Sequence, residues 1–256
     1  MCGIVGALSN RTPDLAGLVE RMADTLAHRG PDDSGVWVDR EAGIGLGHRR
    51  LAIVDLSPAG HQPMISRSGR YIVVYNGEIY NFRELRAELE EAGYVFHGES
   101  DTEVMLGCFD RWGIRGALPR LVGMFAIACW DRAERKLYLI RDRLGEKPIY
   151  VARCAGTFLF ASELKAFRAW PGFLPTIDRG ALSLYFRFNY VPAPFTIYEE
   201  LRKLPPASIL CLGPGDLAEA GVPLERAENY WSARSVAEGG QSRTVGAVDR
   251  AASEIL

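Results

Sequence analysis

The stretch CGIVGAL occupies residues 2–8, at the extreme N-terminus of a chain of 256 residues. Its apolar and β-branched residues, spaced by glycines, predict a strand that is buried inside the protein. A chain end keeps a fixed position only when it is tied into the fold, and a buried first strand provides that anchorage. The stretch therefore predicts that Cys2 is held in place.

Cys2 is a candidate nucleophile because it follows directly after the initiator Met. This Met is commonly removed when the second residue is small, and Cys2 would then carry a free α-amino group with a pKa of about 7.7. Such an amine can accept the thiol proton as a general base, and Gly3 allows a bound ligand to approach the backbone closely. The alternative is an incidental cysteine on a frayed end, which the predicted burial of residues 2–8 disfavours.

Beyond this stretch, the chain combines groups of strands with groups of helices. Helices are predicted at 15–27, 82–92, 101–112 and 178–187, and strands at 35–38, 43–48, 50–54, 70–75, 124–130, 136–142, 148–153, 157–161 and, as the last one, 207–212. The dipeptide Asn76-Gly77 predicts a turn after the strand at 70–75, and residues 131–134 predict a hairpin turn. Many hairpins with grouped helices favour an α+β fold of antiparallel sheets with helices outside, over a doubly wound parallel sheet.

Composition and charge exclude several classes of protein. Hydrophobic residues make up 48% of the chain, and 30 Lys and Arg against 32 Asp and Glu give a net charge of −2. Such a chain lacks the basic footprint of nucleic-acid binding, and no stretch approaches the roughly 20 apolar residues of a membrane span. The N-terminus has no signal-peptide pattern, so a cytoplasmic protein with neither nucleic-acid nor membrane partners is expected. The five cysteines include no CxxC pair, so neither a metal site nor a disulfide framework is expected.

Three further positions carry chemistry, each with a plainer alternative. Asn76 and Gly77 could supply a side-chain and a backbone N–H donor to one point, as an oxyanion hole does, or could form a turn only. Arg50 could bind a carboxylate bidentately, or could be an exposed arginine at a strand end. Asp101 could bind a cationic amine, or could cap a helix. Together with Cys2, these groups would bind and cleave an α-amino acid with a side-chain amide, which points to glutamine.

Eight motifs, in one order, give the chain a resemblance to a known family. They are MCGIVG at 1–6, HRGPD at 28–32, RLAIVD at 50–55, YNGEIYN at 75–81, SDTE at 100–103, GMFAIACWD at 123–131, RDRLGEKPIY at 141–150 and ASELKA at 161–166. On these motifs, residues 1 to about 232 resemble the N-terminal glutaminase domain of glutamine-hydrolysing asparagine synthetases, which are class II glutamine amidotransferases. Sister families such as glucosamine-phosphate synthase carry Thr-Arg-Trp-Ala where this chain has Arg50-Leu51-Ala52-Ile53, so the resemblance favours the asparagine synthetase branch.

The resemblance implies a fold and a set of roles. The implied fold is that of N-terminal nucleophile hydrolases, a four-layer αββα sandwich of two antiparallel sheets flanked by helices. Cys2 resembles the nucleophile, with its freed amine as base, and Asn76 and Gly77 resemble the oxyanion hole. The implied contacts to glutamine are Arg50 at the α-carboxylate, Asp101 at the α-amino group with Glu78 nearby, and a pocket wall of Leu51, Ile53 and Val54. Neither a cofactor nor a metal is expected in this chain.

The resemblance also implies a second domain that activates aspartate with ATP and uses the ammonia. Its Ser-Gly-Gly-x-Asp-Ser loop is absent here, so ATP and Mg are expected only in that synthetase domain, and this chain is expected to be a fragment. Residues 1–232 are predicted as the glutaminase domain. Residues 233–256 are predicted as a linker and the truncated start of the synthetase domain, with a helix at 245–256. The expected partners are glutamine, the synthetase domain and a second copy in a homodimer.

Two alternative functions remain open on the sequence. An amidotransferase of this class could deliver ammonia to another acceptor, because the acceptor site would lie in the absent half. A non-catalytic module could bind glutamine without turnover, although the joint presence of Cys2, Arg50, Asn76 and Asp101 argues against it. Retention of Met1 would block both the thiol and its base, and would favour the binding module.

Overall fold

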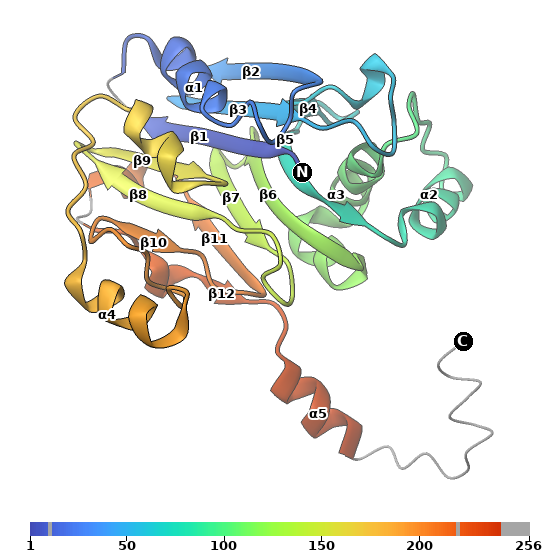
Figure 1. Cartoon of the computed structure of the whole chain (residues 1–256). Helices are drawn as coiled ribbons and strands as arrows, with labels where there is room; N and C mark the ends of the chain where they lie inside the picture. Colours follow the sequence, from blue (N-terminus) through green and yellow to red (C-terminus); the bar gives the residue numbers. More distant parts are fainter. Residues whose placement is uncertain (10–11, 219–220, 242–256) are drawn as a thin grey trace.

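Two six-stranded sheets stack face to face in a computed structural model that describes residues 1–9, 12–218 and 221–241 (Figure 1). The first sheet has the order β10 (Leu201–Lys203), β8 (Tyr150–Cys154), β9 (Thr157–Ala161), β1 (Gly3–Ser9), β3 (Ile44–Arg50) and β2 (Asp33–Asp39). The second has the order β12 (Glu228–Asn229), β11 (Ser208–Leu212), β7 (Lys136–Arg141), β6 (Gly123–Asp131), β5 (Tyr71–Ile79) and β4 (Met64–Ile65). Neighbouring strands are antiparallel in both sheets.

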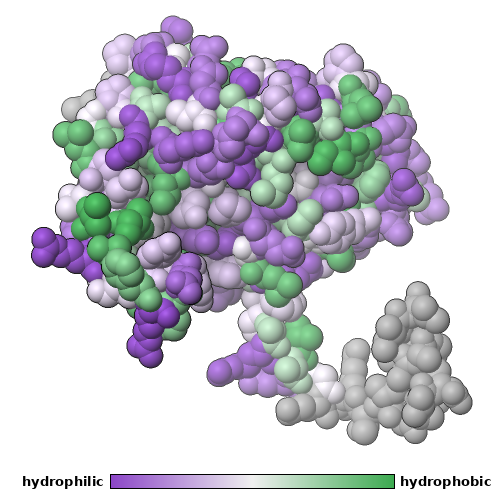
Figure 2. Space-filling model, viewed as in Figure 1, coloured by the Kyte–Doolittle hydropathy of each residue, from purple (hydrophilic) through white to green (hydrophobic). Residues whose placement is uncertain are grey.

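Helices cover the outer face of each sheet. α1 (Leu15–Asp24) and the 3-10 helix η3 (Leu164–Ala169) pack on the first sheet, and α2 (Phe82–Glu91) and α3 (Asp101–Ala117) pack on the second. This arrangement is the four-layer αββα sandwich that the resemblance implied, and the α+β prediction is confirmed. α4 (Arg179–Phe188) lies near β10, and Figure 2 shows hydrophobic surface gathered over it.

Three buried apolar clusters fill the three spaces between the layers. The middle cluster lies between the two sheets, and the outer clusters lie beneath α1 with η3 and beneath α2 with α3. Side chains alternate between the faces of a strand, so Ile4 and Leu8 of β1 point between the sheets while Val5 and Ala7 point toward α1. Both faces of β1 are therefore covered, which explains why its sequence is apolar at nearly every position.

The same alternation positions two polar residues at one end of the sandwich. Ile72 and Val74 of β5 point between the sheets, and Asn76 continues this series. Cys2 continues the series of Ile4 and Leu8 at the start of β1. The fold thus directs Cys2 and Asn76 toward the space between the sheets, where both line the same pocket.

The predicted turn at Asn76-Gly77 is wrong. β5 continues through both residues to Ile79, and Asn76 and Gly77 stand opposite Ala126 and Phe125 of β6. A Cβ atom on Gly77 would lie 2.3 Å from the Met124 carbonyl oxygen, so the glycine lets the β6 backbone come close. Long-range pairing with β6 therefore outweighs the local turn preference of the dipeptide.

The strand predicted at 50–54 is also wrong. β3 runs as one strand from Ile44 to Arg50, after which the chain leaves the sheet as a loop. The Arg50 guanidinium donates to the backbone carbonyls of Asp55 and Ser57, and these bonds curl the loop back around the side chain. The strand at 207–212 is not the last, because the two-residue β12 follows it.

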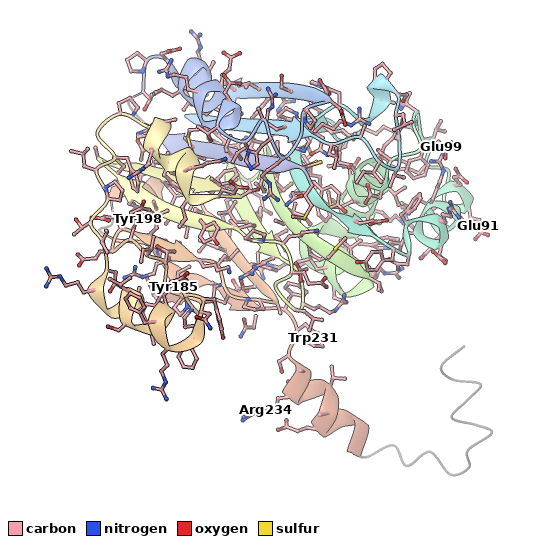
Figure 3. The ribbon with its side chains drawn as sticks, in the orientation of Figure 1. Glu91, Glu99, Tyr185, Tyr198, Trp231 and Arg234 are labelled. Atoms are coloured by element: carbon pink, nitrogen blue, oxygen red, sulfur yellow. The ribbon has the colours of Figure 1, made fainter. Side chains whose placement is uncertain are left out.

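The described chain leaves the sandwich at Trp231 and continues into α5 (Ala233–Gln241), which carries Arg234 and projects away from the sheets (Figure 3). This helix lies within the segment predicted as a linker. The helix expected at 245–256 lies outside the described residues, and the boundary between two domains stays a prediction. None of the described helices has the length and apolarity needed to span a bilayer.

Candidate active site

A pocket of about 110 Å³ opens at the end of the sandwich where β1, β3, β5 and α3 meet. All nine residues predicted for the site line it: Cys2, Arg50, Leu51, Ile53, Val54, Asn76, Gly77, Glu78 and Asp101. Nine further residues complete the lining: Met1, Asp55, Gly60, Gln62, Tyr75, Ser100, Thr102, Met124 and Lys147. Residues as far apart in sequence as 2 and 101 are therefore brought together, while their chemical roles stay predictions.

Hydrogen bonds fix the N-terminus at the edge of this pocket. The Arg29 Nε donates to the Cys2 carbonyl at 2.9 Å, and Arg29 Nη1 donates to Glu163 Oε1 at 2.8 Å. These two residues belong to the HRGPD and ASELKA motifs, which the sequence left without a role. Their contacts indicate that both motifs anchor the first residues of the chain.

The thiol of Cys2 is held by the backbone of Leu51. The Leu51 N–H lies 3.3 Å from Cys2 Sγ as a donor, and the Leu51 carbonyl lies 3.6 Å from it as an acceptor. Burial raises the pKa of the Cys2 thiol, and the hydrogen bond from Leu51 opposes that shift. The thiol is therefore protonated at neutral pH, and a nucleophilic role requires a base that removes its proton.

Two N–H donors are aimed into the same pocket. The Asn76 side chain is 1% exposed, and its Nδ2 has no hydrogen-bond partner among the described residues. On β5, the N–H groups of Tyr75 and Ile79 donate to Gln62 Oε1 at 2.7 Å and to Asp101 Oδ2 at 3.0 Å, so both point away from β6. By the period of two along a strand, the N–H of Gly77 points the same way, toward the pocket. A buried donor without a hydrogen-bond partner costs free energy, which indicates that Asn76 Nδ2 donates to an atom of a bound ligand.

The Arg50 guanidinium brings a buried positive charge to the pocket. Its Nη1 donates to the Ser57 carbonyl at 2.9 Å, and Gly60 leaves the space that the guanidinium fills, since a Cβ there would lie 2.1 Å from Nη2. Arg50 is 8% exposed and forms no ion pair with a carboxylate in the described part of the chain. The prediction of an exposed strand-end arginine is therefore excluded, and the site can accept an anion.

Asp101 provides the opposite charge at the first residue of α3. Its carboxylate accepts hydrogen bonds from Tyr75 Oη at 2.7 Å and from the Ile79 N–H. Burial raises the pKa of Asp101 above its ordinary value, and these two hydrogen bonds oppose the shift. The helix-cap alternative is wrong, because the side chain of Ser100 caps α3 by accepting from the Glu103 N–H at 3.2 Å.

The apolar side chains predicted to form the pocket wall are only partly buried. Leu51, Ile53 and Val54 line the pocket from the loop after β3, but Ile53 is 68% exposed. Glu78 lines the pocket from β5 beside the two donors. Among the described residues, no group of three His, Cys, Asp or Glu side chains is placed to hold a metal ion.

Two supporting residues were not found by the sequence argument. Gln62 bridges the Tyr75 N–H and, through its Nε2 at 3.3 Å, the Thr102 hydroxyl, and thereby joins β5 to α3. His48 on β3 lies with its Nε2 3.1 Å from the Tyr75 carbonyl, so it joins one sheet to the other next to Asn76. Neither residue stands in a recognisable motif, because its role depends on a contact that only the folded chain creates.

A thiol, two convergent N–H donors, a cation and an anion thus share one small pocket. Such a set can hold the charged α-carboxylate and α-ammonium of an amino acid and present its side-chain carbonyl to the thiol.

Comparison with known proteins agrees with this interpretation of the pocket. A family model described as a glutamine amidotransferase domain matches residues 1–231. The chain is 37% identical over 240 residues to glutamine-hydrolyzing asparagine synthetase 3 of Bacillus subtilis, a match that covers 92% of this chain and 37% of that protein. It is 38% identical over 222 residues to asparagine synthetase 1 of the same organism, covering 85% of this chain and 34% of that protein. The chain therefore spans about a third of the length of these relatives.

The solved structures show the same fold. Glutamine phosphoribosylpyrophosphate amidotransferase from B. subtilis, complexed with ADP and GMP, matches with a TM-score of 0.65 and 20% identity. The match covers 90% of this chain and 49% of that chain. At 20% identity, this match shows that the two chains share the arrangement of sheets and helices, and nothing more.

The burial of His48 predicts a pH dependence of stability. Burial lowers the pKa of His48 to about 4, from an ordinary value of 6.5. Between these values the unfolded chain binds a proton that the folded chain does not, so stability falls as the pH drops from 6.5 to 4, by about 3 kcal/mol for this group. We expect His48→Gln to flatten this slope in urea unfolding measured at several pH values. The exposed His97→Gln variant serves as control, and an unchanged slope in His48→Gln would contradict the prediction.

Proposed function

This chain belongs to the glutamine amidotransferase domain family, and from that premise we propose that its pocket hydrolyses the side-chain amide of glutamine to glutamate and ammonia. It is homologous to the glutaminase part of asparagine synthetases. The observation that carries the proposal is the unpartnered, buried Nδ2 of Asn76 in the same pocket as the thiol of Cys2.

The charges of the pocket orient the substrate. In the proposal, the Arg50 guanidinium binds the α-carboxylate of glutamine, and the Asp101 carboxylate binds the α-ammonium group with Glu78 nearby. The side-chain amide then faces Cys2, while Leu51, Ile53 and Val54 contact the methylene groups. Holding both ends of the amino acid converts the attack into an effectively unimolecular step.

The chemistry is acyl transfer. The Cys2 thiolate attacks the amide carbon, and the oxygen of the tetrahedral intermediate accepts hydrogen bonds from the Asn76 side chain and the Gly77 N–H. The proton taken from the thiol passes to the amide nitrogen, which leaves as ammonia, and a γ-glutamyl thioester remains on Cys2. Water then attacks the thioester, glutamate is released, and the thiol is restored.

The base in this scheme is the α-amino group of Cys2, which exists only after Met1 is removed. While Met1 is attached, the nitrogen of Cys2 is an amide that cannot accept a proton. Met1 is 56% exposed, so a peptidase can reach it. A base is needed because burial raises the pKa of the thiol.

We further propose that the ammonia serves the ATP-dependent amidation of aspartate in a synthetase domain, where ATP and Mg would bind. Support comes from the relatives, which are glutamine-hydrolyzing asparagine synthetases in which the matched part makes up 34 to 37% of the protein. Delivery of ammonia to another acceptor is the alternative, and adding candidate acceptors with ATP to a complete homologue separates the two.

The test of the glutaminase proposal is the release of glutamate and ammonia from glutamine. We expect the chain freed of Met1, as confirmed by intact mass, to release both products in equal amounts. Cys2→Ala should release neither, because it lacks the nucleophile, and should still bind glutamine in calorimetry. A processed chain that binds glutamine without turnover would instead be a glutamine-binding module.

Asn76→Ala tests the oxyanion hole. Removing one donor of this kind typically lowers kcat about 10²- to 10³-fold. We expect a loss of this size in steady-state glutamate formation, with little change in KM, because the donor acts on the transition state. Asn229→Ala, at an exposed position on β12, is the matched control. A loss that appears only in KM would assign Asn76 to substrate binding instead.

Asp101→Asn tests recognition of the α-ammonium group. The substitution keeps the shape of the side chain and removes its charge, so the KM for glutamine should rise about 10- to 100-fold with a smaller change in kcat. Wild type should also prefer glutamine strongly over N-acetylglutamine, and the variant should lose most of this preference. If the variant retains the full preference, Asp101 does not bind the amine.

A further inference from the structure

The loop between β7 and β8 brings a buried ammonium group to the N-terminal residue. Lys147 is 7% exposed and lines the Cys2 pocket, and its Nζ lies 3.1 Å from the Sδ of Met1. No carboxylate within the described ranges forms an ion pair with it. Buried lysines are usually paired with an acidic side chain, so a buried Lys147 without such a partner indicates a functional role.

The loop holds Lys147 rigidly. The carboxylate of Asp142 accepts hydrogen bonds from three backbone N–H groups of the loop, those of Leu144 at 3.1 Å, Glu146 at 2.9 Å and Lys147 at 2.9 Å. The buried Arg141 donates through Nε to the Lys147 carbonyl at 2.8 Å. These bonds use only the backbone of Lys147, so they fix its Cα position and leave its side chain directed at the chain terminus.

We propose that Lys147 keeps the α-amino group of Cys2 in its neutral form through like-charge repulsion. This inference rests on the proposed function, in which that amine is the base for the thiol. When Met1 is removed, the thioether contact of Lys147 is lost with it. The new α-amino group of Cys2 then forms at the bond by which Met1 was attached, and Met1, Cys2 and Lys147 all line the same pocket.

The size of the effect matters at neutral pH. With an ordinary pKa of about 7.7, only about a sixth of an α-amine is neutral at pH 7. A nearby cation disfavours the protonated amine, and lowering the pKa by about one unit would make about two thirds of it neutral. Lys147 would thus raise the fraction of chains that are ready to accept the thiol proton about fourfold.

Other charged groups lie around the pocket and its N-terminal edge, and three of these seven pair with one another. Arg50, Asp55, Glu78 and Asp101 line the pocket with Cys2. Arg29 donates to the Cys2 carbonyl and pairs with Glu163, which also pairs with Lys165. The cation of Arg50 faces the proposed substrate carboxylate, while Glu78 and Asp101 face its ammonium group. Lys147 is a cation that contacts Met1, and among the described residues it forms no ion pair with a carboxylate.

The test measures the pKa of the α-amine directly. In a Cys2→Ser background, which removes the thiol and its activity, the pH dependence of acetylation of the α-amine by acetic anhydride reports its pKa, with intact mass confirming that Met1 is absent. We expect Lys147→Met and Lys147→Gln to raise this pKa by about one unit. Lys147→Arg, which keeps the charge, should leave it near the value of the Cys2→Ser parent. Lys136→Met, at an exposed lysine on β7, should also leave it unchanged.

The activity profile gives a second readout. With Cys2 present, Lys147→Met should move the acidic limb of the pH profile of kcat/KM for glutamine to higher pH by about one unit. At pH 9 its activity should return toward that of wild type. An equal loss of activity at all pH values with an unchanged amine pKa would mean a structural role and overturn the proposal. If the amine pKa shifts as expected but wild type does not hydrolyse glutamine, the role of Lys147 stands and the glutaminase proposal fails.

Discussion

β1 lies in the middle of a six-stranded sheet, bonded to β3 on one side and to β9 on the other, and this pairing fixes Cys2. A terminal residue would otherwise fray and could not face a defined pocket. Both faces of β1 are covered by apolar clusters, so the strand cannot shift by one residue without turning its core side chains to the wrong face. The register that buries Ile4 and Leu8 is the register that directs Cys2 toward Asn76.

The pocket gathers groups that would be unfavourable elsewhere in the protein. Asn76 has a buried donor without a partner, Arg50 has a buried charge without a carboxylate, and burial raises the pKa of both Cys2 and Asp101. The Asn76 donor, the Arg50 charge and the Asp101 carboxylate each cost stability in the free protein, and in the proposed function each meets one part of the bound glutamine. Their concentration in one place, on rigid strands and a helix N-terminus, is typical of a binding or catalytic site.

The sequence predicted this architecture and nine of the eighteen residues that line the pocket, and its errors have identifiable physical origins. The apolar run of β1 and the motif resemblance located the sandwich and the site. The Asn76-Gly77 turn failed because pairing with β6 holds both residues extended, which local preference cannot reveal. Asp101 looked like a cap because the true cap, Ser100, immediately precedes it. Gln62 and His48 act through contacts across 13 to 40 positions of sequence, so nothing in their own neighbourhood indicated their roles. Lys147 lies in the motif at 141–150, but its contact with Met1 spans 146 positions.

Detection of the covalent intermediate on Cys2 tests the proposed mechanism most directly. Chain freed of Met1 would be mixed with isotopically labelled glutamine, quenched in acid within the first turnovers, and examined by intact mass and peptide mapping. The account predicts a γ-glutamyl group on Cys2 that disappears as glutamate forms, and no such group on any other residue. Release of glutamate without an adduct at Cys2, or release by a chain in which Cys2 is replaced by alanine, would contradict it.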